Sequence, residues 1–172
     1  MGRPFFVFNR TFRIIPPAMA PPSPILVLGI GNYLLGDEGI GVHAARALSA
    51  EPFPPHVSVL DGGTGGFHLM EHFQRYPIVI LIDATMDGAT PGTVRVTRPR
   101  FASDFPRALS AHDIGLRDLI ESTILTGKLP ETHLVTISIG ELNEMTTELS
   151  PAVRAAMPDV IASVKEILAA YG

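Results

Sequence analysis

The fold is decided by residues 25–41, ILVLGIGNYLLGDEGIG. This stretch opens with a continuous apolar run, residues 25–30, which is typical of a strand buried on both faces. A glycine-rich loop follows and ends in two adjacent acids, Asp37 and Glu38, where a helix over residues 38–50 is expected to begin. We expect Asp37 to be the N-cap of this helix. The order strand, loop, helix indicates the first unit of a parallel sheet.

The alternation of strand and helix patterns continues to the end of the chain. Further strands are predicted at residues 57–60, 78–82, 93–97 and 134–139, and further helices at residues 67–76, about 113–126 and from 151 onward. The strand at 93–97 alternates apolar and polar residues and is expected at an edge of the sheet. Pro158 is expected to kink or split the last helix. We therefore expect one α/β domain in three layers, with a twisted, mainly parallel sheet of about five strands and helices on both faces.

Composition limits the classes of function. The chain has 172 residues, of which 46% are hydrophobic and 17% charged, as in a globular domain. It contains no cysteine, which excludes thiolate chemistry and disulfides and fits a cytoplasmic protein. A net charge of −4 without a basic stripe argues against nucleic-acid binding, and no apolar run is long enough to span a membrane. Residues 1–24 are rich in proline and are expected to be a disordered extension, which leaves residues 25–172 as the functional domain.

Three chemically capable side chains are expected at the same edge of the sheet. Ligands of open α/β sheets bind beyond the carboxyl ends of the strands, where Glu38 and Asp83 follow strands and His112 opens a helix. Two carboxylates and one imidazole suit zinc, nickel, iron or manganese, and three ligands leave a position open for water or substrate. Spacing alone leaves open that these are three unrelated polar residues. Asp61 also ends a strand, and it either orients a ligand or hydrogen-bonds its own glycine-rich turn.

Two competing motifs are weaker. The glycine-rich loop lacks the third glycine of a dinucleotide-binding fingerprint, and two acids at the helix start would repel a pyrophosphate. The segment His68-Leu69-Met70-Glu71-His72 matches an inverted zinc-peptidase pattern. His68, Glu71 and His72 nevertheless share one helical stripe opposite apolar residues, which is typical of the polar face of a small amphipathic helix.

The motifs together resemble those of the hydrogenase maturation endopeptidases. The similarity runs from about Ile25 to Leu168. It rests on G-x-G-N-x-L-x-x-D-E-G-x-G at residues 29–41, the turn at 61–64, Asp83-Ala84 and Ser110-Ala111-His112. Ala111 departs from the proline that the family usually has before the histidine. The resemblance implies a single α/β domain with endopeptidase activity, metal-dependent and aspartyl-type in some classifications.

The resemblance also implies a substrate and roles for the site residues. The family removes a C-terminal extension from the large-subunit precursor of a nickel–iron hydrogenase after nickel insertion. Glu38, Asp83 and His112 match the family's catalytic and metal-contacting positions. The nickel would be presented by the precursor, so that the resting enzyme is metal-free or adventitiously loaded. We expect a cytoplasmic monomer whose partner is this precursor. Two alternatives stay open: a non-catalytic module that binds the metallated precursor, and a zinc peptidase that uses His68, Glu71 and His72.

Overall fold

The structure is a computed structural model that describes residues 22–105, 116–127, 129–141 and 145–172. The strands are β1 (Ile25–Gly29), β2 (Val57–Asp61), β3 (Ile78–Thr85), β4 (Val94–Thr97) and β5 (Glu131–Ser138). The α-helices are α1 (Ile40–Ser49), α2 (Met70–Arg75), α3 (Leu116–Thr126) and α4 (Pro151–Ala169), and short 3-10 turns lie at η1 (Gly36–Gly39), η2 (Phe67–Leu69) and η3 (Ala102–Asp104). The predicted start of α3 and the proposed extension up to residue 21 fall outside the described residues.

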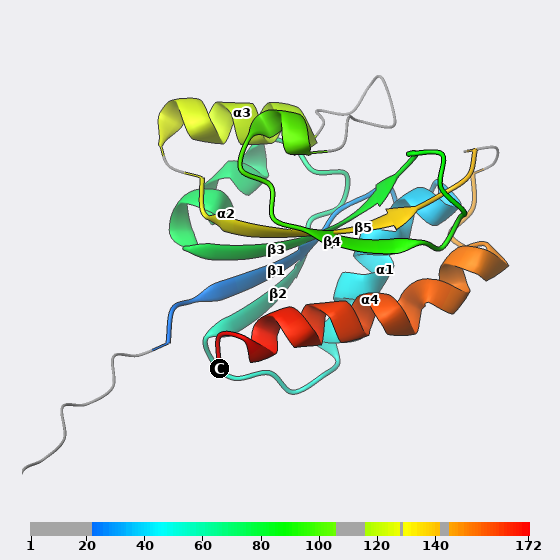
Figure 1. The fold of residues 1–172 in the computed structure, drawn as a ribbon, viewed down its shortest axis with the longest axis horizontal. Helices are drawn as coiled ribbons and strands as arrows, with labels where there is room; N and C mark the ends of the chain where they lie inside the picture. Colours follow the sequence, from blue (N-terminus) through cyan, green and yellow to red (C-terminus); the bar gives the residue numbers. More distant parts are fainter. Residues whose placement is uncertain (1–21, 106–115, 128, 142–144) are drawn as a thin grey trace, which may run out of the picture.

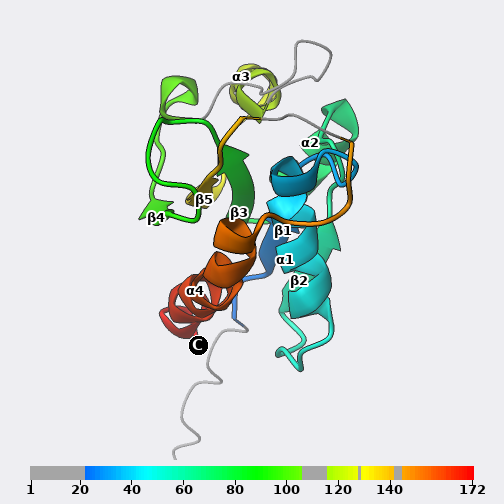
Figure 2. The same cartoon turned by 90° about the vertical axis from the view of Figure 1, so that its right-hand side faces the viewer.

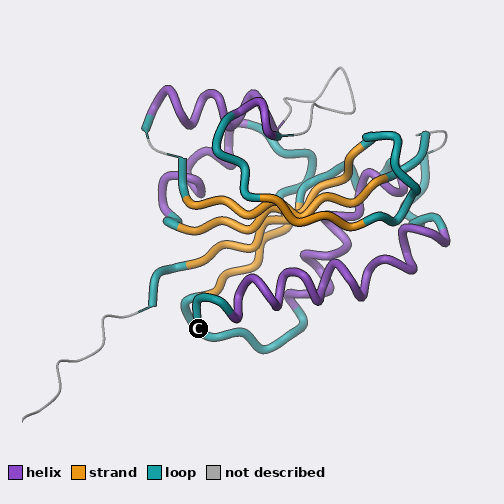
Figure 3. Tube along the Cα trace, viewed as in Figure 1, coloured by secondary structure: helices purple, strands orange, loops and turns teal. Residues whose placement is uncertain are grey.

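The five strands form one sheet in the order β2-β1-β3-β5-β4 (Figure 3). All neighbouring pairs are parallel except β4, which runs antiparallel to β5 at the edge of the sheet. This confirms the mainly parallel sheet and the edge position of the alternating strand. β3 and β5 are longer than predicted because their parallel pairing runs from Ile78–Glu131 to Thr85–Ser138.

Helices cover both faces of the sheet, as predicted. Figure 1 shows α1 and α4 below the sheet and α2 and α3 above it, and the turned view in Figure 2 keeps this arrangement. Side chains of β3 alternate between the two layers: Ile80 and Ile82 pack with α1 and α4, whereas Val79 and Leu81 pack with α2 and α3. The two apolar layers account for the near-continuous apolar strands in the sequence.

A close backbone contact joins the start of α1 to the central strands β1 and β3. A Cβ atom on Gly41 would lie 2.2 Å from the carbonyl oxygen of Ile30 and 2.3 Å from that of Ile82. A Cβ atom on Gly29 would lie 1.9 Å from the carbonyl oxygen of Gly41. Only glycine permits this backbone-to-backbone packing. It brings the turn that carries Glu38 directly against the carboxyl end of the sheet.

The predicted cap of α1 is wrong. The helix begins at Ile40, after the 3-10 turn η1, and its N-cap residue is Gly39 without a side-chain cap. Asp37 lies inside that turn, and its Oδ1 accepts a hydrogen bond of 2.7 Å from the backbone N–H of Ser150. The carboxylate of Asp37 therefore accepts a hydrogen bond from a distant part of the chain, rather than from the first turn of α1 as the local sequence pattern predicts.

The predicted splitting of the last helix is also wrong. α4 is continuous from Pro151 to Ala169, although Pro158 lies inside it. Pro158 is on the exposed side, and burial of Val153 and Val160 on either side of it fixes both halves against the sheet. The predicted N-cap of this helix is confirmed, since Ser150 Oγ accepts a hydrogen bond of 3.4 Å from the backbone N–H of Val153. None of the helices in the described part of the chain combines the length and hydrophobicity needed to cross a bilayer.

We predict that Gly41→Ala destabilises the protein by at least about 3 kcal/mol, because the new methyl group meets two backbone carbonyls that cannot move independently. Urea unfolding measures the change. Gly127→Ala is the matched control, since a Cβ atom there meets nothing within 4 Å. The control is expected to change stability by less than about 0.5 kcal/mol. Equal stability of the two variants would contradict the close packing of α1.

Candidate active site

Two of the three predicted site residues lie together at the carboxyl edge of the sheet. Glu38 is held in η1 and is 6% exposed, which is unusual for a glutamate. Asp83 is partly buried in β3. Strand alternation places its side chain on the same face as Leu81, the face that α2 and α3 cover. The strand does not end at Asp83 as predicted but continues to Thr85. Asp83 therefore lies within regular strand structure, with strand residues both before and after it.

The protonation of Asp83 is strongly perturbed. Burial of its carboxyl group is the largest cause that raises the pKa, from 3.8 to about 8. The backbone N–H of Ala84 donates to Oδ1 at 2.9 Å and opposes the rise, whereas the negative charge of Glu38 adds to it. The two carboxylates therefore form an electrostatically coupled pair that disfavours full ionisation and favours a neighbouring cation.

The third predicted residue, His112, lies outside the described residues. Its place among the ligands therefore stays a prediction that rests on the sequence. In the described ranges, no group of three histidine, cysteine, aspartate or glutamate side chains is arranged to hold a metal ion. Glu38 and Asp83 thus supply a two-carboxylate part of the predicted site.

The competing zinc motif is not assembled. His68 and Glu71 are exposed on η2 and α2, and His72 Nε2 lies 3.9 Å from Glu71 Oε1. Leu69 and Phe73 are buried on the opposite side, as expected for a small amphipathic helix. These residues do not belong to any three-residue metal group in the part of the chain that the structure describes.

Asp61 supports the site loop through its glycine-rich turn. Its Oδ1 accepts a hydrogen bond of 3.0 Å from the backbone N–H of Gly63, and its Oδ2 accepts one of 2.9 Å from Arg46 Nε. The carbonyl of Gly63 in turn accepts a hydrogen bond of 2.8 Å from the backbone N–H of Gly31. Of the two roles left open for Asp61, the structure shows the hydrogen bond to its own turn. Sequence reasoning missed the Arg46 contact, because no local pattern pairs a helix residue with the following strand end.

A distant segment locks the loop that carries Glu38. The backbone N–H of Gly36 donates to the carbonyl of Thr146 at 2.7 Å, and the backbone N–H of Thr146 donates to the carbonyl of Leu34 at 2.9 Å. The bond from Ser150 to Asp37 completes this contact, which we call the loop lock (residues 34–37 and 146–150). No short-range signal in the sequence predicts it.

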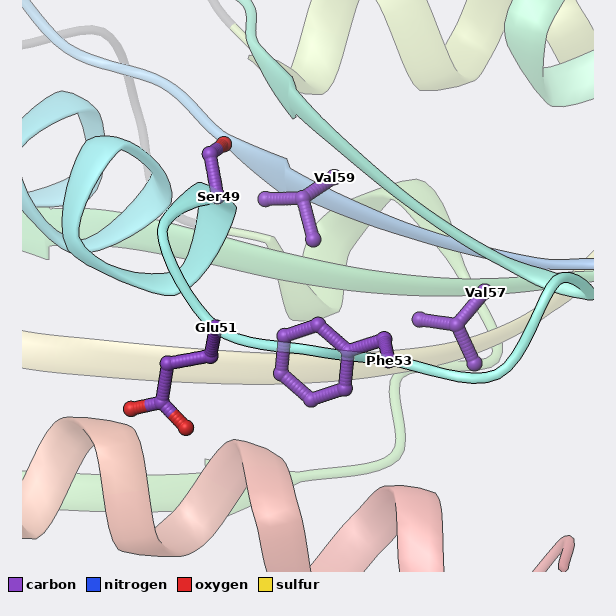
Figure 4. A pocket seen from close by; sticks show the side chains of 5 residues that line it. All are labelled: Ser49, Glu51, Phe53, Val57 and Val59. Carbon is purple, nitrogen blue, oxygen red and sulfur yellow. The ribbon is translucent and has the colours of Figure 1, made fainter.

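A hollow in the surface lies away from the carboxyl edge of the sheet. It has a volume of about 250 Å³ and is lined by Ser49, Glu51, Phe53, Val57 and Val59 between the end of α1 and β2 (Figure 4). Val57 is the first residue of β2 and pairs with Ile25, the first residue of β1. The hollow is therefore at the amino ends of these strands, where open α/β sheets rarely bind ligands.

Comparison with known proteins identifies the class. The model of the family described as hydrogenase maturation protease matches residues 42–167. The chain is 37% identical over 161 residues to the hydrogenase expression/formation protein HupM of Azotobacter chroococcum, covering 90% of this chain and 76% of that protein. It is 35% identical over 149 residues to the hydrogenase 2 maturation protease of Escherichia coli, covering 83% of this chain and 91% of that protein.

The fold agrees with the sequence relationships. The solved structure of the hydrogenase maturating endopeptidase HybD from Escherichia coli superposes with a TM-score of 0.78 at 33% identity, covering 87% of this chain and 94% of that chain. The match covers the whole α/β domain of that endopeptidase structure, so the two chains share one fold. The chain belongs to the hydrogenase maturation protease family.

We predict that the free energy of unfolding falls as the pH rises, because the buried carboxyl group of Asp83 must then ionise. Its folded-state pKa of about 8 lies above the unfolded value of 3.8, so its stabilising contribution is complete below about pH 4 and is lost as the pH rises through 8. Asp83→Asn cannot ionise. The free energy of unfolding of this variant, relative to the wild type, should therefore increase by roughly 4 kcal/mol between about pH 5 and about pH 9.

Urea unfolding in the presence of a chelator measures this difference. Asp159→Asn, which removes a negative charge from the exposed side of α4, is the matched control for net charge. A stability difference between Asp83→Asn and wild type that does not vary with pH would contradict the perturbed carboxyl group.

We predict that Asp37→Ala weakens the loop lock and lowers stability by about 1–2 kcal/mol, because the buried N–H of Ser150 loses its acceptor. Asp37→Asn keeps an acceptor oxygen and should cost less than about 0.5 kcal/mol. Urea unfolding distinguishes the two. Equal losses would indicate that the charge of Asp37, rather than this hydrogen bond, is what matters.

Proposed function

We propose that the protein removes the C-terminal extension of a nickel–iron hydrogenase large-subunit precursor after nickel has been inserted. Glu38, Asp83 and His112 would recognise the nickel that the precursor carries. Family membership supports the class of substrate, and the coupled carboxylates of Glu38 and Asp83 support the recognition of a cation. That coupled pair is the observation that carries the proposal.

The electrostatics of the pair explain why a cation is needed. Two carboxylates at a buried edge repel each other, and Asp83 keeps its proton near neutral pH in the absence of a counter-charge. A divalent ion on the precursor would balance both negative charges and release that proton. The donor set of two carboxylate oxygens and one imidazole nitrogen suits nickel. The site would thus be complete only when a loaded precursor is bound.

The same residues can serve the cleavage step. Contact with the nickel would hold the peptide bond of the precursor beside the two carboxylates. A carboxylate that is not fully engaged would accept a proton from the attacking water, as a general base. Either Glu38 or Asp83 would serve as this general base.

A second candidate function keeps the same site without turnover: a module that binds the metallated precursor and does not cut it. Incubation with nickel-loaded precursor, followed by mass spectrometry, separates the two. A shortened large subunit and a released peptide support the peptidase, whereas a stable complex with full-length precursor supports the module. The expected cytoplasmic location and monomeric state stay predictions.

We predict that nickel-loaded precursor is shortened, whereas precursor lacking nickel stays intact under the same conditions. The reason is that the carboxylate pair gains its binding energy only from a cation. Gel mobility and the mass of the large subunit measure the outcome. Equal shortening of both precursors would refute recognition of nickel while leaving the peptidase activity itself in place.

We also predict that Glu38→Gln, Asp83→Asn and His112→Ala each lower the rate of processing at least about a hundredfold, because each removes a contact worth several kcal/mol. His68→Ala is the matched control for a histidine, and Glu71→Gln is the matched control for a carboxylate. Both controls should retain full activity. Loss of processing in His68→Ala together with full activity in His112→Ala would favour the zinc-peptidase alternative.

A further inference from the structure

A hollow lined by both polar and apolar residues lies on the face of the sheet where the side chain of Asp83 lies. It has a volume of about 200 Å³ and is bounded on one side by the buried ring of Phe105. We call it the threonine hollow. Its lining residues are the apolar Phe105 and Leu134 and the polar Thr85, Asp87, Arg95, Thr97, Asp104 and Thr136. Most of the interior of this face is apolar, so a hollow with these polar lining residues is a distinct feature of the fold.

Strand register links the hollow to the site. Asp83 of β3 pairs with Thr136 of β5, and Thr136 pairs with Arg95 of β4. Paired residues of neighbouring strands project from the same face, so these side chains form one row across three strands. Adjacent strands are about 4.8 Å apart, and one residue of an extended peptide spans about 3.3 Å. A peptide held at Asp83 therefore reaches the hollow within one or two residues.

Two carboxylates and one guanidinium line the hollow beside its threonines. The single guanidinium, that of Arg95, is engaged by the carboxylate of Asp87. Asp104 Oδ2 accepts hydrogen bonds from the backbone N–H groups of Arg100 at 2.9 Å and Phe101 at 3.0 Å, and these bonds lower the pKa of Asp104. Both carboxylates keep further lone pairs for a ligand.

The threonine hydroxyl groups add to this set. Within residues 22–105, 116–127, 129–141 and 145–172, the hydroxyl groups of Thr85, Thr97 and Thr136 make no hydrogen bond to another described residue. Convergent polar groups around a hollow of this size are typical of a pocket for a specific side chain. The carboxylates of Asp87 and Asp104 favour a side chain with N–H groups and repel a carboxylate.

We propose that the threonine hollow is a substrate pocket that takes one side chain of the precursor, within two residues of the cut bond, and selects a side chain with N–H donors. The proposal rests on the proposed function, since it names a selective contact for the same site. Glutamine, asparagine, lysine and arginine side chains meet the requirement. Glutamate and leucine, which are of similar size to glutamine, do not.

The test uses the full-length protein and nickel-loaded precursors. Each of the two residues on either side of the cut bond is replaced in turn by glutamine, glutamate or leucine, and kcat/KM is measured for each precursor. At one of these positions, glutamine is expected to be processed at least about tenfold faster than glutamate or leucine.

Variants of the threonine hollow then test whether this preference for glutamine depends on the residues that line it. Thr136→Val keeps the shape of the side chain but removes a hydroxyl group, and it should reduce the preference for glutamine over leucine at that position by about tenfold. Val96→Thr is the matched control, because it adds a hydroxyl group on the opposite face of β4. The control should leave the preference unchanged, and urea unfolding checks that both variants are folded.

The outcomes separate the two levels of the proposal. If the unsubstituted nickel-loaded precursor is not shortened at all, the proposed function fails and this proposal fails with it. If precursors are shortened but show no preference at any of the four positions, the pocket is refuted while the proposed function stands. A preference that survives Thr136→Val unchanged likewise refutes the pocket.

Discussion

The close approach of α1 to the central strands is the constraint on which the site depends. With no side chain at Gly41, the helix backbone rests directly on the carbonyl of Ile30, just after β1, and on that of Ile82 within β3. Gly31 extends the same principle to the loop, since its φ is 141° and a Cβ atom there would lie 1.9 Å from the carbonyl oxygen of Glu38. Backbone contacts of this kind leave little freedom, so the position of Glu38 is set by the main chain rather than by packing of its own side chain.

That placement has an electrostatic cost. Glu38 is nearly inaccessible, and its charge helps to keep a proton on Asp83. Burial of like charges at a sheet edge is unfavourable for the folded protein by itself, and such pairs are characteristic of functional sites. The chain that carries this unfavourable pair, Glu38 and Asp83, belongs to the hydrogenase maturation protease family.

The helices and strands that could be predicted from the sequence are those marked by patterns of neighbouring residues. Buried parallel strands appear as apolar runs, and Ser150-Pro151 starts α4 as its sequence indicates. Asp37 was misjudged as a helix cap, and Pro158 does not split α4, because tertiary contacts override these local preferences. The pairing of Arg46 with Asp61 could not be read from spacing, because it depends on how α1 lies against β2. The association of Glu38 with Asp83 was predictable because parallel strands bring their carboxyl ends to one edge.

The loop lock has a consequence for how the chain matures. Asp37 lies early in the sequence, yet its partner Ser150 follows 113 residues later. During synthesis, the loop that bears Glu38 cannot reach its final hydrogen bonding until the ribosome has released the segment that leads into α4. An N-terminal fragment that already contains Glu38 and the whole sheet would still lack this restraint. The edge of the sheet that bears Glu38 and Asp83 is therefore among the last parts of the nascent chain to gain its final hydrogen bonds.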